Sequence, residues 1–395
     1  MNKLINLHKK KKKIAIGIMS GTSLDGVDIA LIEISGNSTN TKIKTIAFDE
    51  FPFPKNFNKY VLDNSQTPTS NVEDICRLNF LVARIYADAV KKFCKKINFN
   101  LSKVDFIGSH GQTIQHLPQK LKMFGFDSSS TLQIGCPSVL AKLTGVITIG
   151  DFRTGDIALG GQGAPLVPYF DYIMFHSKRK NRALLNIGGI SNFTILNKNY
   201  GQEKVIAFDT GPGNMMIDTL MQKFFNKKYD KNGEVGLSGK LNPELFEALK
   251  IKDDYLEKKP PKSTGREYYG ELFLNPLLKK FSKIKKEDWI DTITKFTAYG
   301  VYRNYEKFVK KETKIDELIV SGGGAKNLLL LIYLKEYFRK DVKVEVIDNI
   351  GFPSDAKEAI CFAVLANETI CGNASNIPRV TGASKPTILG KICLP

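Results

Sequence analysis

The sequence is poor in cysteine and histidine, and neither is spaced for metal binding. The six cysteines form no C-x-x-C pair, and the four histidines show no H-E-x-x-H spacing. Scattered cysteines of this kind are typical of free thiols in a reducing compartment. We therefore expect neither a disulfide framework nor a protein-built transition-metal site.

Long apolar runs are also missing. The 395-residue chain has no stretch of about 18 apolar residues, which a membrane-spanning helix would need. The lysine-rich start, MNKLINLHKKKKK, is not followed by the apolar segment and cleavage site of a secretory signal. The sequence therefore predicts a cytoplasmic protein with no membrane partner.

Positive charge is abundant, with a formal net charge of +18. The basic residues are spread over the whole chain, without interleaved aromatic residues or a nucleic-acid-binding motif. This pattern favours a solvated surface that attracts anionic ligands, and it predicts no nucleic-acid partner. A nucleotide-binding or nucleic-acid-binding scaffold without turnover is the alternative from another functional class.

Two common phosphate-transfer signatures are absent, namely the G-x-x-x-x-G-K-[ST] loop and the protein-kinase catalytic loop. Residues 14–34, IAIGIMSGTSLDGVDIALIEI, instead predict two β-strands joined by a turn at Asp25-Gly26. The first strand ends in glycine, serine and threonine, whose backbone amides can approach an anionic oxygen closely. We expect this hairpin to hold phosphate; the alternative is a plain hairpin whose glycines serve only the turn.

Strand and helix patterns alternate along the chain and restart near residue 182. Strands are expected at residues 42–51, 131–134 and 317–320, among others, and a helix is expected to begin at Ser70, which forms a capping-box candidate with Glu73. A strand, Gly-Ser loop and strand at residues 183–196 repeat the layout of the opening hairpin. The sequence predicts an α/β fold of two duplicated domains, residues 14–175 and 180–395, with a nucleotide-binding cleft between them. The Gly- and Pro-broken region that contains KNGEVGLSG and PPKSTGRE is expected to be an insertion able to close over a ligand.

Polar groups follow several of the expected strands, at the strand ends where open α/β sheets hold ligands. His110 follows one such strand, Arg153 and Asp156 follow the next, and Asp209 follows a strand in the second half. A helix is expected to open at Asn214, with its backbone amides facing a ligand at the strand end. These groups are the candidate site residues.

Seven segments resemble the anhydro-N-acetylmuramic acid kinase family: GIMSGTSLDGVDIAL, IGSHGQTIQH, GDFRTGDIALGGQGAPLVP, LNIGGISNFT, FDTGPGNMMID, SGGGAKN and VTGASKPTILG. They extend from about residue 14 to residue 390, and the N-terminal lysine tract is not part of the family pattern. The resemblance implies two RNase H-like domains, as in actin, hexokinase and the heat-shock chaperone ATPases. It also implies a homodimer.

The resemblance further implies an ATP- and Mg²⁺-dependent enzyme of peptidoglycan recycling. Members hydrolyse the 1,6-anhydro bridge of 1,6-anhydro-N-acetylmuramic acid and phosphorylate O6, giving N-acetylmuramic acid 6-phosphate and ADP. The anhydro sugar has no free 6-hydroxyl, so one carboxylate that activates the water attacking C1 can drive both steps. An ordinary sugar kinase of the same superfold, acting on a free hydroxyl, is the alternative.

The family motifs assign roles to individual residues. Asp209 is expected to be the base and Glu358 to orient the water or polarise C1; for each, a helix-capping role is the alternative. Asp25 and Asp28 are candidate Mg²⁺ ligands, although Asp25 alternatively serves only the turn. The expected nucleotide-binding residues are Gly21, Thr22, Ser23, Leu24, Asp25, Gly26, Val27 and Asp28, with Gly188, Gly189 and Ser191 facing the phosphates, and Gly322, Gly323 and Gly324 along the adenosine.

His110, Arg153 and Asp156 are the expected sugar-binding residues. Arg153 suits the lactyl carboxylate of muramic acid, which a guanidinium can bind through two hydrogen bonds. A surface ion pair is the alternative for Arg153, and packing beneath the strand end is the alternative for His110.

Overall fold

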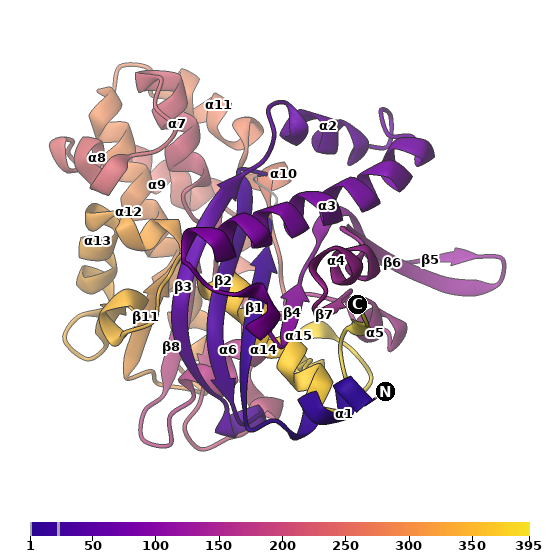
Figure 1. Ribbon diagram of the computed structural model, residues 1–395. Coiled ribbons are helices and arrows are strands. Elements are labelled where there is room, and N and C mark those ends of the chain that lie inside the picture. Colours follow the sequence, from indigo (N-terminus) through magenta and orange to yellow (C-terminus); the bar gives the residue numbers. More distant parts are fainter. Residues whose placement is uncertain (1, 22–23) are drawn as a thin grey trace. The chain divides into compact units, whose positions relative to one another are not determined.

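The computed structural model describes residues 2–21 and 24–395, without the side chains of Asn2 and Arg266. The chain forms two compact units, shown in Figure 1. Unit 1 contains the chain up to residue 174 together with residues 355–395, and unit 2 contains residues 175–354. The expected second domain therefore lacks its last segment, because helix α14 (Lys357–Cys371) packs on strands of unit 1.

Unit 1 is built on a six-stranded sheet with the order β13-β7-β4-β1-β2-β3. Strands β1 to β3 form an antiparallel meander, and β4 and β7 run parallel to β1. The expected opening hairpin and third strand are confirmed. The strands are β1 (Lys12–Met19), β2 (Gly26–Ser35), β3 (Lys42–Pro52), β4 (Phe106–Ser109), β7 (Ile147–Gly150) and β13 (Lys391–Cys393).

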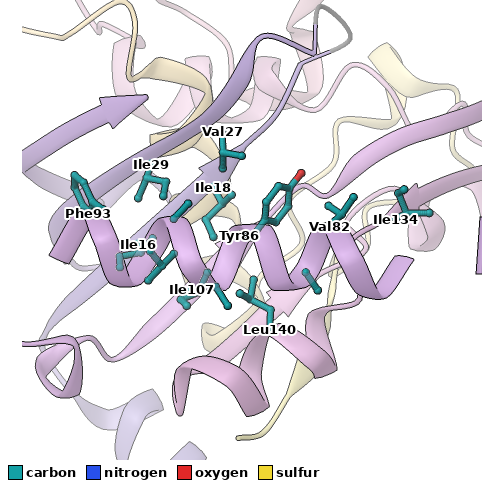
Figure 2. Close-up of a cluster of buried hydrophobic side chains, with 14 of the residues drawn as sticks. Ile16, Ile18, Val27, Ile29, Val82, Tyr86, Phe93, Ile107, Ile134 and Leu140 are labelled. Carbon is teal, nitrogen blue, oxygen red and sulfur yellow. The ribbon is translucent and has the colours of Figure 1, made fainter. Parts of the chain in front are cut away.

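Two long helices cover opposite faces of this sheet. Helix α3 (Val72–Lys96) packs on the face that carries Ile16 and Ile18, where Val82, Tyr86 and Phe93 complete a buried apolar cluster (Figure 2). Gly17 lies between these two isoleucines and points to the other face, because side chains alternate along a strand. Helix α14 packs on that second face, against β1 and β4.

The remaining elements of unit 1 surround this three-layer core. Helix α3 begins after an Asn71 cap, whose side chain accepts a hydrogen bond from the Asp74 amide, rather than after the expected Ser70. A two-stranded ribbon, β5 (Gln112–Met123) and β6 (Phe126–Ile134), was expected only at residues 131–134. The other helices are α1 (Asn2–Lys9), α2 (Phe57–Asn64), α4 (Pro137–Thr144), α5 (Thr154–Ala158), α6 (Val167–Phe175) and α15 (Pro378–Thr381).

Unit 2 repeats this architecture around a five-stranded sheet with the order β10-β9-β8-β11-β12. Its first three strands are again an antiparallel meander, and the next two are parallel to its first strand. Shared strand order and direction in both units confirm the expected duplicated RNase H-like fold, while the interdomain cleft stays a prediction. The strands are β8 (Arg182–Ile187), β9 (Ile190–Leu196), β10 (Ile206–Pro212), β11 (Glu317–Ser321) and β12 (Lys343–Val346).

The helices of unit 2 bury two apolar clusters, one under the sheet and one within the segment between β10 and β11. Among the described residues, no helix is long and apolar enough to cross a membrane. The helices are α7 (Met215–Phe225), α8 (Glu234–Ser238), α9 (Pro243–Lys252), α10 (Arg266–Tyr269), α11 (Glu271–Lys280), α12 (Lys286–Asn304) and α13 (Leu328–Phe338).

Candidate functional site

The opening hairpin of unit 1 has a longer connection than the expected Asp25-Gly26 turn. Strand pairing ends at Met19 and Asp28, and β2 begins at Gly26. Leu24 adopts a left-handed conformation, with φ of 56°, and its amide donates to the Gly21 carbonyl at 3.2 Å. The expected phosphate contacts of Thr22 and Ser23 lie outside the described residues.

A group of carboxylates surrounds Asp28 at the start of β2. Asp28 lies directly opposite Glu50 on β3, so two like charges face each other across the sheet. Burial, followed by the charges of Glu50, Glu358, Asp355 and Asp25, raises the pKa of Asp28 to about 7. A cation would relieve this repulsion. Glu50 is a member of the group that the sequence motifs did not indicate.

Glu358 lies in the first turn of α14, within reach of the same hairpin. The α14 cap is Ala356, so the expected capping-box alternative with Asp355 is wrong. The Glu358 side chain is exposed, yet desolvation by the surrounding protein raises its pKa, while the nearby charges of Lys357 and Arg153 oppose this shift. Glu358 can therefore hold a proton more readily than an ordinary glutamate.

His110 and Arg153 form a hydrogen-bonded pair at the ends of β4 and β7. The His110 Nδ1–H donates to the Gly111 carbonyl at 2.9 Å, which leaves Nε2 as the acceptor for Arg153 Nε at 3.1 Å and Nη2 at 2.9 Å. Arg153 Nη1 also donates to the Gly163 carbonyl at 2.8 Å. These bonds use three of the five guanidinium N–H groups, and the other two suit one carboxylate of a ligand.

The protonation states of this pair follow from its surroundings. Burial, with a smaller effect from the positive charge of Arg153, lowers the pKa of His110 well below its usual value. The imidazole is therefore neutral, and it also packs on the Phe362 ring at 4.7 Å between centroids. Packing, the alternative for His110, thus describes part of its environment, and its contact with the sugar stays a prediction.

Asp156 is fully buried, and its carboxylate is used within unit 1. Its oxygens accept hydrogen bonds from Gly163 N at 2.8 Å, Asn376 Nδ2 at 2.7 Å and Thr381 Oγ1 at 2.6 Å. These contacts tie the glycine-rich loop, which also binds Arg153, to the C-terminal segment. The expected sugar contact of Asp156 is therefore corrected to a positioning role.

In unit 2, Asp209 lies at a bulge in β10 where pairing with β9 shifts register. Its Oδ2 accepts a hydrogen bond from the Thr264 amide at 3.0 Å, and its own amide donates to the Lys262 carbonyl at 3.2 Å. The cap of the following helix α7 is Asn214, so the helix-cap alternative for Asp209 is wrong. The segment around Lys262, part of the expected insertion, thus holds the candidate base directly.

The electrostatic environment of Asp209 suits a base. Burial raises its pKa to about 6, and the charge of Glu267 adds to this shift, whereas the Thr264 amide and Lys262 oppose it. Lys262 lies over the Tyr255 ring at 4.5 Å, and burial lowers its own pKa to about 8. The PPKSTGRE segment was expected only to be an insertion, with no role for Lys262 or Thr264.

At the second glycine loop, between β8 and β9, some groups that were expected to contact a ligand are used within unit 2. The amides of Asn214 and Met215, at the start of α7, donate to the carbonyls of Gly188 and Gly189 at 2.8 and 3.1 Å. These amides are thus used within unit 2 instead of facing a ligand. Ser191 is fully buried, and its hydroxyl bonds to Thr210 and to backbone carbonyls of β10, which indicates a structural role for that side chain.

A third glycine cluster follows β11. Gly322 has φ of +80°, and its amide donates to Ser354 Oγ at 3.0 Å. A Cβ on Gly324 would lie 2.4 Å from the Ile187 side chain, so glycine lets this segment approach β8 closely. Gly323 is exposed and remains accessible beside it.

Unit 2 also contains a cavity of about 730 Å³ beside Gly189, lined by α7 and α11. Met215, Asp218 and Leu274 contribute to its wall, and burial raises the pKa of Asp218 to about 7. The volume is within the range that encloses small-molecule ligands.

The fold and these groups together define a class of protein. Two RNase H-like units carry a glycine hairpin beside carboxylates in one unit, and a carboxylate with a raised pKa at a strand end in the other. This combination is that of an actin-like ATPase or sugar kinase.

Comparison with known proteins assigns the family. The family model described as anhydro-N-acetylmuramic acid kinase matches residues 13–395, and the chain belongs to this family. An anhydro-N-acetylmuramic acid kinase of Caldanaerobacter subterraneus subsp. tengcongensis is 45% identical over 398 residues, with 100% of both chains covered. One of Clostridioides difficile is 47% identical over 378 residues, covering 96% of this chain and 97% of that protein.

A solved structure, component A of the (R)-2-hydroxyglutaryl-CoA dehydratase of Acidaminococcus fermentans, covers 91% of this chain and 99% of its own. It is 12% identical, with a TM-score of 0.46. Because that score is below 0.5, the fold assignment rests on the shared strand order of the two sheets.

Proposed function

We propose that this protein is an ATP-dependent kinase of peptidoglycan recycling. Its substrate is 1,6-anhydro-N-acetylmuramic acid, and its products are N-acetylmuramic acid 6-phosphate and ADP. Family membership over almost the whole chain supports the reaction. The observation that carries the mechanism is the half-buried Asp209 carboxylate, with a pKa of about 6 and one oxygen held by the Thr264 amide.

Asp209 acts as the general base in this proposal. It takes a proton from a water molecule whose oxygen bonds to C1 while the C1–O6 bond breaks. The released O6 then attacks the γ-phosphorus of ATP, and ADP leaves. A carboxylate with a pKa of about 6 is ionised at neutral pH and is still a better proton acceptor than an ordinary aspartate.

The cluster in unit 1 binds and orients the sugar. Arg153, held by His110 and Gly163, binds the lactyl carboxylate through its two remaining N–H groups. Glu358, whose pKa is raised, orients the attacking water or polarises C1. Asp156 keeps the glycine-rich loop in place and does not touch the sugar.

Residues 21–28 hold the phosphates of ATP, with Gly188 and Gly189 as further phosphate contacts and residues 322–324 along the adenosine. Asp28 and Asp25 are the residues that would hold Mg²⁺. Burial, followed by repulsion from neighbouring carboxylates, raises the pKa of Asp28, and a divalent cation would relieve that repulsion. Among the described residues, no three His, Cys, Asp or Glu side chains are placed so that they could hold a metal ion by themselves, which fits an ion that takes most of its ligands from phosphate and water. When bound, Mg²⁺ supplies charge neutralisation for the phosphates.

A product assay tests this proposal against an ordinary sugar kinase. Purified protein is incubated with ATP and Mg²⁺ and with either the anhydro sugar or N-acetylmuramic acid, and the products are identified by mass spectrometry. We expect the 6-phosphate from the anhydro sugar. Phosphorylation of the open sugar alone would overturn the proposal. We further propose that the enzyme is a cytoplasmic homodimer.

A further inference from the structure

A buried ion pair joins helix α6 to the first turn of helix α14 in unit 1. Lys357 Nζ lies 2.7 Å from Asp171 Oδ1, and the two residues are only 4% and 2% exposed. Among the described residues, no hydrogen-bond donor besides this ammonium group reaches that oxygen. Because Lys357 directly precedes Glu358, the pair holds the turn that carries the carboxylate expected to act near C1 of the sugar.

Stability alone gives no reason for a buried lysine at this position. A cation in the first turn of a helix lies at the positive end of the helix dipole, which is unfavourable. Removal of two charges from water is also costly, and a buried ion pair can often be replaced by apolar residues of similar volume without loss of stability. The pair between Lys357 and Asp171 therefore calls for a functional explanation.

The pair belongs to a cluster of charged groups around the thiol of Cys361, one turn further along α14. Cys361 follows Lys357 by four residues and Glu358 by three, so the three side chains lie on one side of the helix. Burial raises the pKa of the Cys361 thiol well above its ordinary value, and four charged neighbours also act on it, namely Asp171, Lys357, Glu358 and Arg153. The ion pair thus lies close to the groups that are expected to bind the sugar.

Helix α6 also contacts α14 near its other end. The Tyr169 hydroxyl donates to Glu368 Oε2 at 3.0 Å, and the Ser38 amide donates to Glu368 Oε1 at 3.0 Å. The Glu368 side chain is fully buried. Since α6 holds α14 near both ends, through Asp171 and Tyr169, it fixes the position of α14 along the helix axis and with it the place of the first turn.

We propose that Lys357 is a positioning residue for Glu358. Asp171 fixes the ammonium group of Lys357, and the pair thereby holds the first turn of α14 where the Glu358 carboxylate can reach the sugar. Lys357 itself is buried and does not touch a ligand. The inference rests on the role of Glu358 in the proposed function, and it adds which residues put this carboxylate in place.

The charge of Lys357 supports the same role. Burial raises the pKa of Glu358, and the positive charges of Lys357 and Arg153 oppose this shift. A neutral side chain in place of Lys357 would therefore favour the protonated acid, which is a weaker hydrogen-bond acceptor for the attacking water. Lys357 thus acts on Glu358 through both its position and its charge.

Kinetics of two substitutions at Lys357 separate charge from packing. Lys357→Met keeps the length of the side chain and removes its charge, whereas Lys357→Arg keeps the charge on a bulkier group. A displacement of about 1 Å can cost about 10²-fold in rate, so we expect kcat to fall roughly 100-fold in Lys357→Met and less than about fivefold in Lys357→Arg. The KM for ATP should change less than about twofold in both, because the buried side chain does not contact the nucleotide. A role in packing alone would give the opposite order.

A double variant and a matched control exclude an effect of unfolding. Lys357→Met leaves Asp171 as a buried charge without its partner, so Lys357→Met with Asp171→Asn is measured as well. The double variant should unfold within about 3 °C of wild type and still show the loss of kcat. Lys13→Met is the control, because Lys13 is also buried, at 3% exposure, and bonds to α14 at Asn367, far along the helix from Glu358. It should keep kcat within about twofold of wild type.

Four results would overturn the positioning role: a double variant with the kcat of wild type, an equal loss of kcat in Lys13→Met, a greater loss in Lys357→Arg than in Lys357→Met, or a double variant that loses activity only because it unfolds. Each assay offers the anhydro sugar and N-acetylmuramic acid separately. A wild type that phosphorylates the open sugar alone contradicts the proposed reaction, and the comparison of variants on that sugar still decides the role of Lys357.

Discussion

A Cβ atom on Gly17 would lie 1.8 Å from the backbone carbonyl oxygen of Ala359, so strand β1 and helix α14 meet where only glycine fits. Gly108 on β4 makes a similar contact with the Phe362 carbonyl, at 2.1 Å. Ala359 follows Glu358 directly, and β1 leads into the phosphate hairpin. The two glycines thus fix the helix that carries Glu358 against the strand that supports the hairpin.

Gly17→Ala is expected to destabilise unit 1 by about 3 kcal/mol, because neither backbone can move without disturbing the sheet. It should also lower kcat, since the shift displaces Glu358. Urea unfolding and steady-state kinetics measure both effects. Gly188→Ala is the control for stability, because an added carbon there would meet no atom closer than 3.7 Å. Equal stability of the two variants would contradict this account.

Asp209→Asn is expected to reduce kcat by a factor of about 10³, since general-base catalysis contributes about 10²–10⁴. ATP binding, measured by calorimetry, should change little because the asparagine side chain keeps the acceptor for the Thr264 amide. Asp253→Asn is a useful comparison, because Asp253 also has a pKa raised to about 6 but bonds to Tyr269. Turnover in Asp209→Asn at the wild-type rate would exclude this residue as the base.

The pH dependence of kcat/KM should show loss of activity below about pH 6, where Asp209 becomes protonated. Lys262→Met removes a positive charge that lowers the pKa of Asp209, so the acidic limb should move to higher pH. Lys258→Met is the matched control, because Lys258 also lies over the Tyr255 ring, whereas the charges that shift Asp209 are those of Lys262 and Glu267. A limb that stays in place in Lys262→Met would show that this lysine does not tune the base.

Asp28→Asn is expected to stabilise the protein without ligands at pH 8 while weakening ATP binding in the presence of Mg²⁺. The folded-state pKa, about 7, exceeds the unfolded value, about 3.9, so stability contributed by the protonated form is lost as pH rises from 4 to 7. Allowing for solvent screening of a partly exposed group, the free energy of unfolding should rise by about 1–2 kcal/mol at pH 8 and by less at pH 5. Thermal unfolding at both pH values measures this change in stability. A loss of stability at pH 8 would contradict the interpretation that like charges repel the Asp28 carboxylate.

Arg153→Lys is expected to reduce selectivity for the lactyl carboxylate, because an ammonium cannot reproduce the paired N–H groups. The ratio of kcat/KM for the anhydro muramic sugar to that for 1,6-anhydro-N-acetylglucosamine, which has no lactyl group, should fall at least tenfold. Arg77→Lys, in an exposed ion pair with Glu73, is the control and should leave the ratio unchanged. An unchanged ratio in Arg153→Lys would show that the lactyl carboxylate of the sugar does not bind to Arg153.

The sequence predicted most strands of both sheets because their buried apolar runs are short and end in glycine or polar residues. Residues 42–51 and 317–320, for example, coincide closely with β3 and β11. The β5–β6 ribbon was missed except at its base, since its distal strands mix serine, lysine and isolated apolar residues with no neighbouring layer to impose a pattern. The place of α14 in unit 1 was missed because it depends on contacts with Gly17 and Gly108, far away in the sequence.

The residues of the candidate site were predictable only where the residue type and its place in a motif indicate a chemical role. His110, Arg153 and Glu358 are brought together in unit 1, as their electrostatic coupling shows. The burial of Asp156 and Ser191 was not visible, because a polar residue in a loop has the same sequence signal whether it faces a ligand or bonds to the backbone. Lys262 was also missed, because only the fold of a long insertion brings it near Asp209.

Unit 2 is inserted into unit 1, and this has a consequence for synthesis on the ribosome. Residues 175–354 have all been synthesised before α14 and the edge strand β13 are made. The sheet that begins at the N-terminus therefore stays without one of its two covering layers until translation ends. We expect the later-encoded unit to be complete first, in reverse of the usual N-to-C order of domain folding.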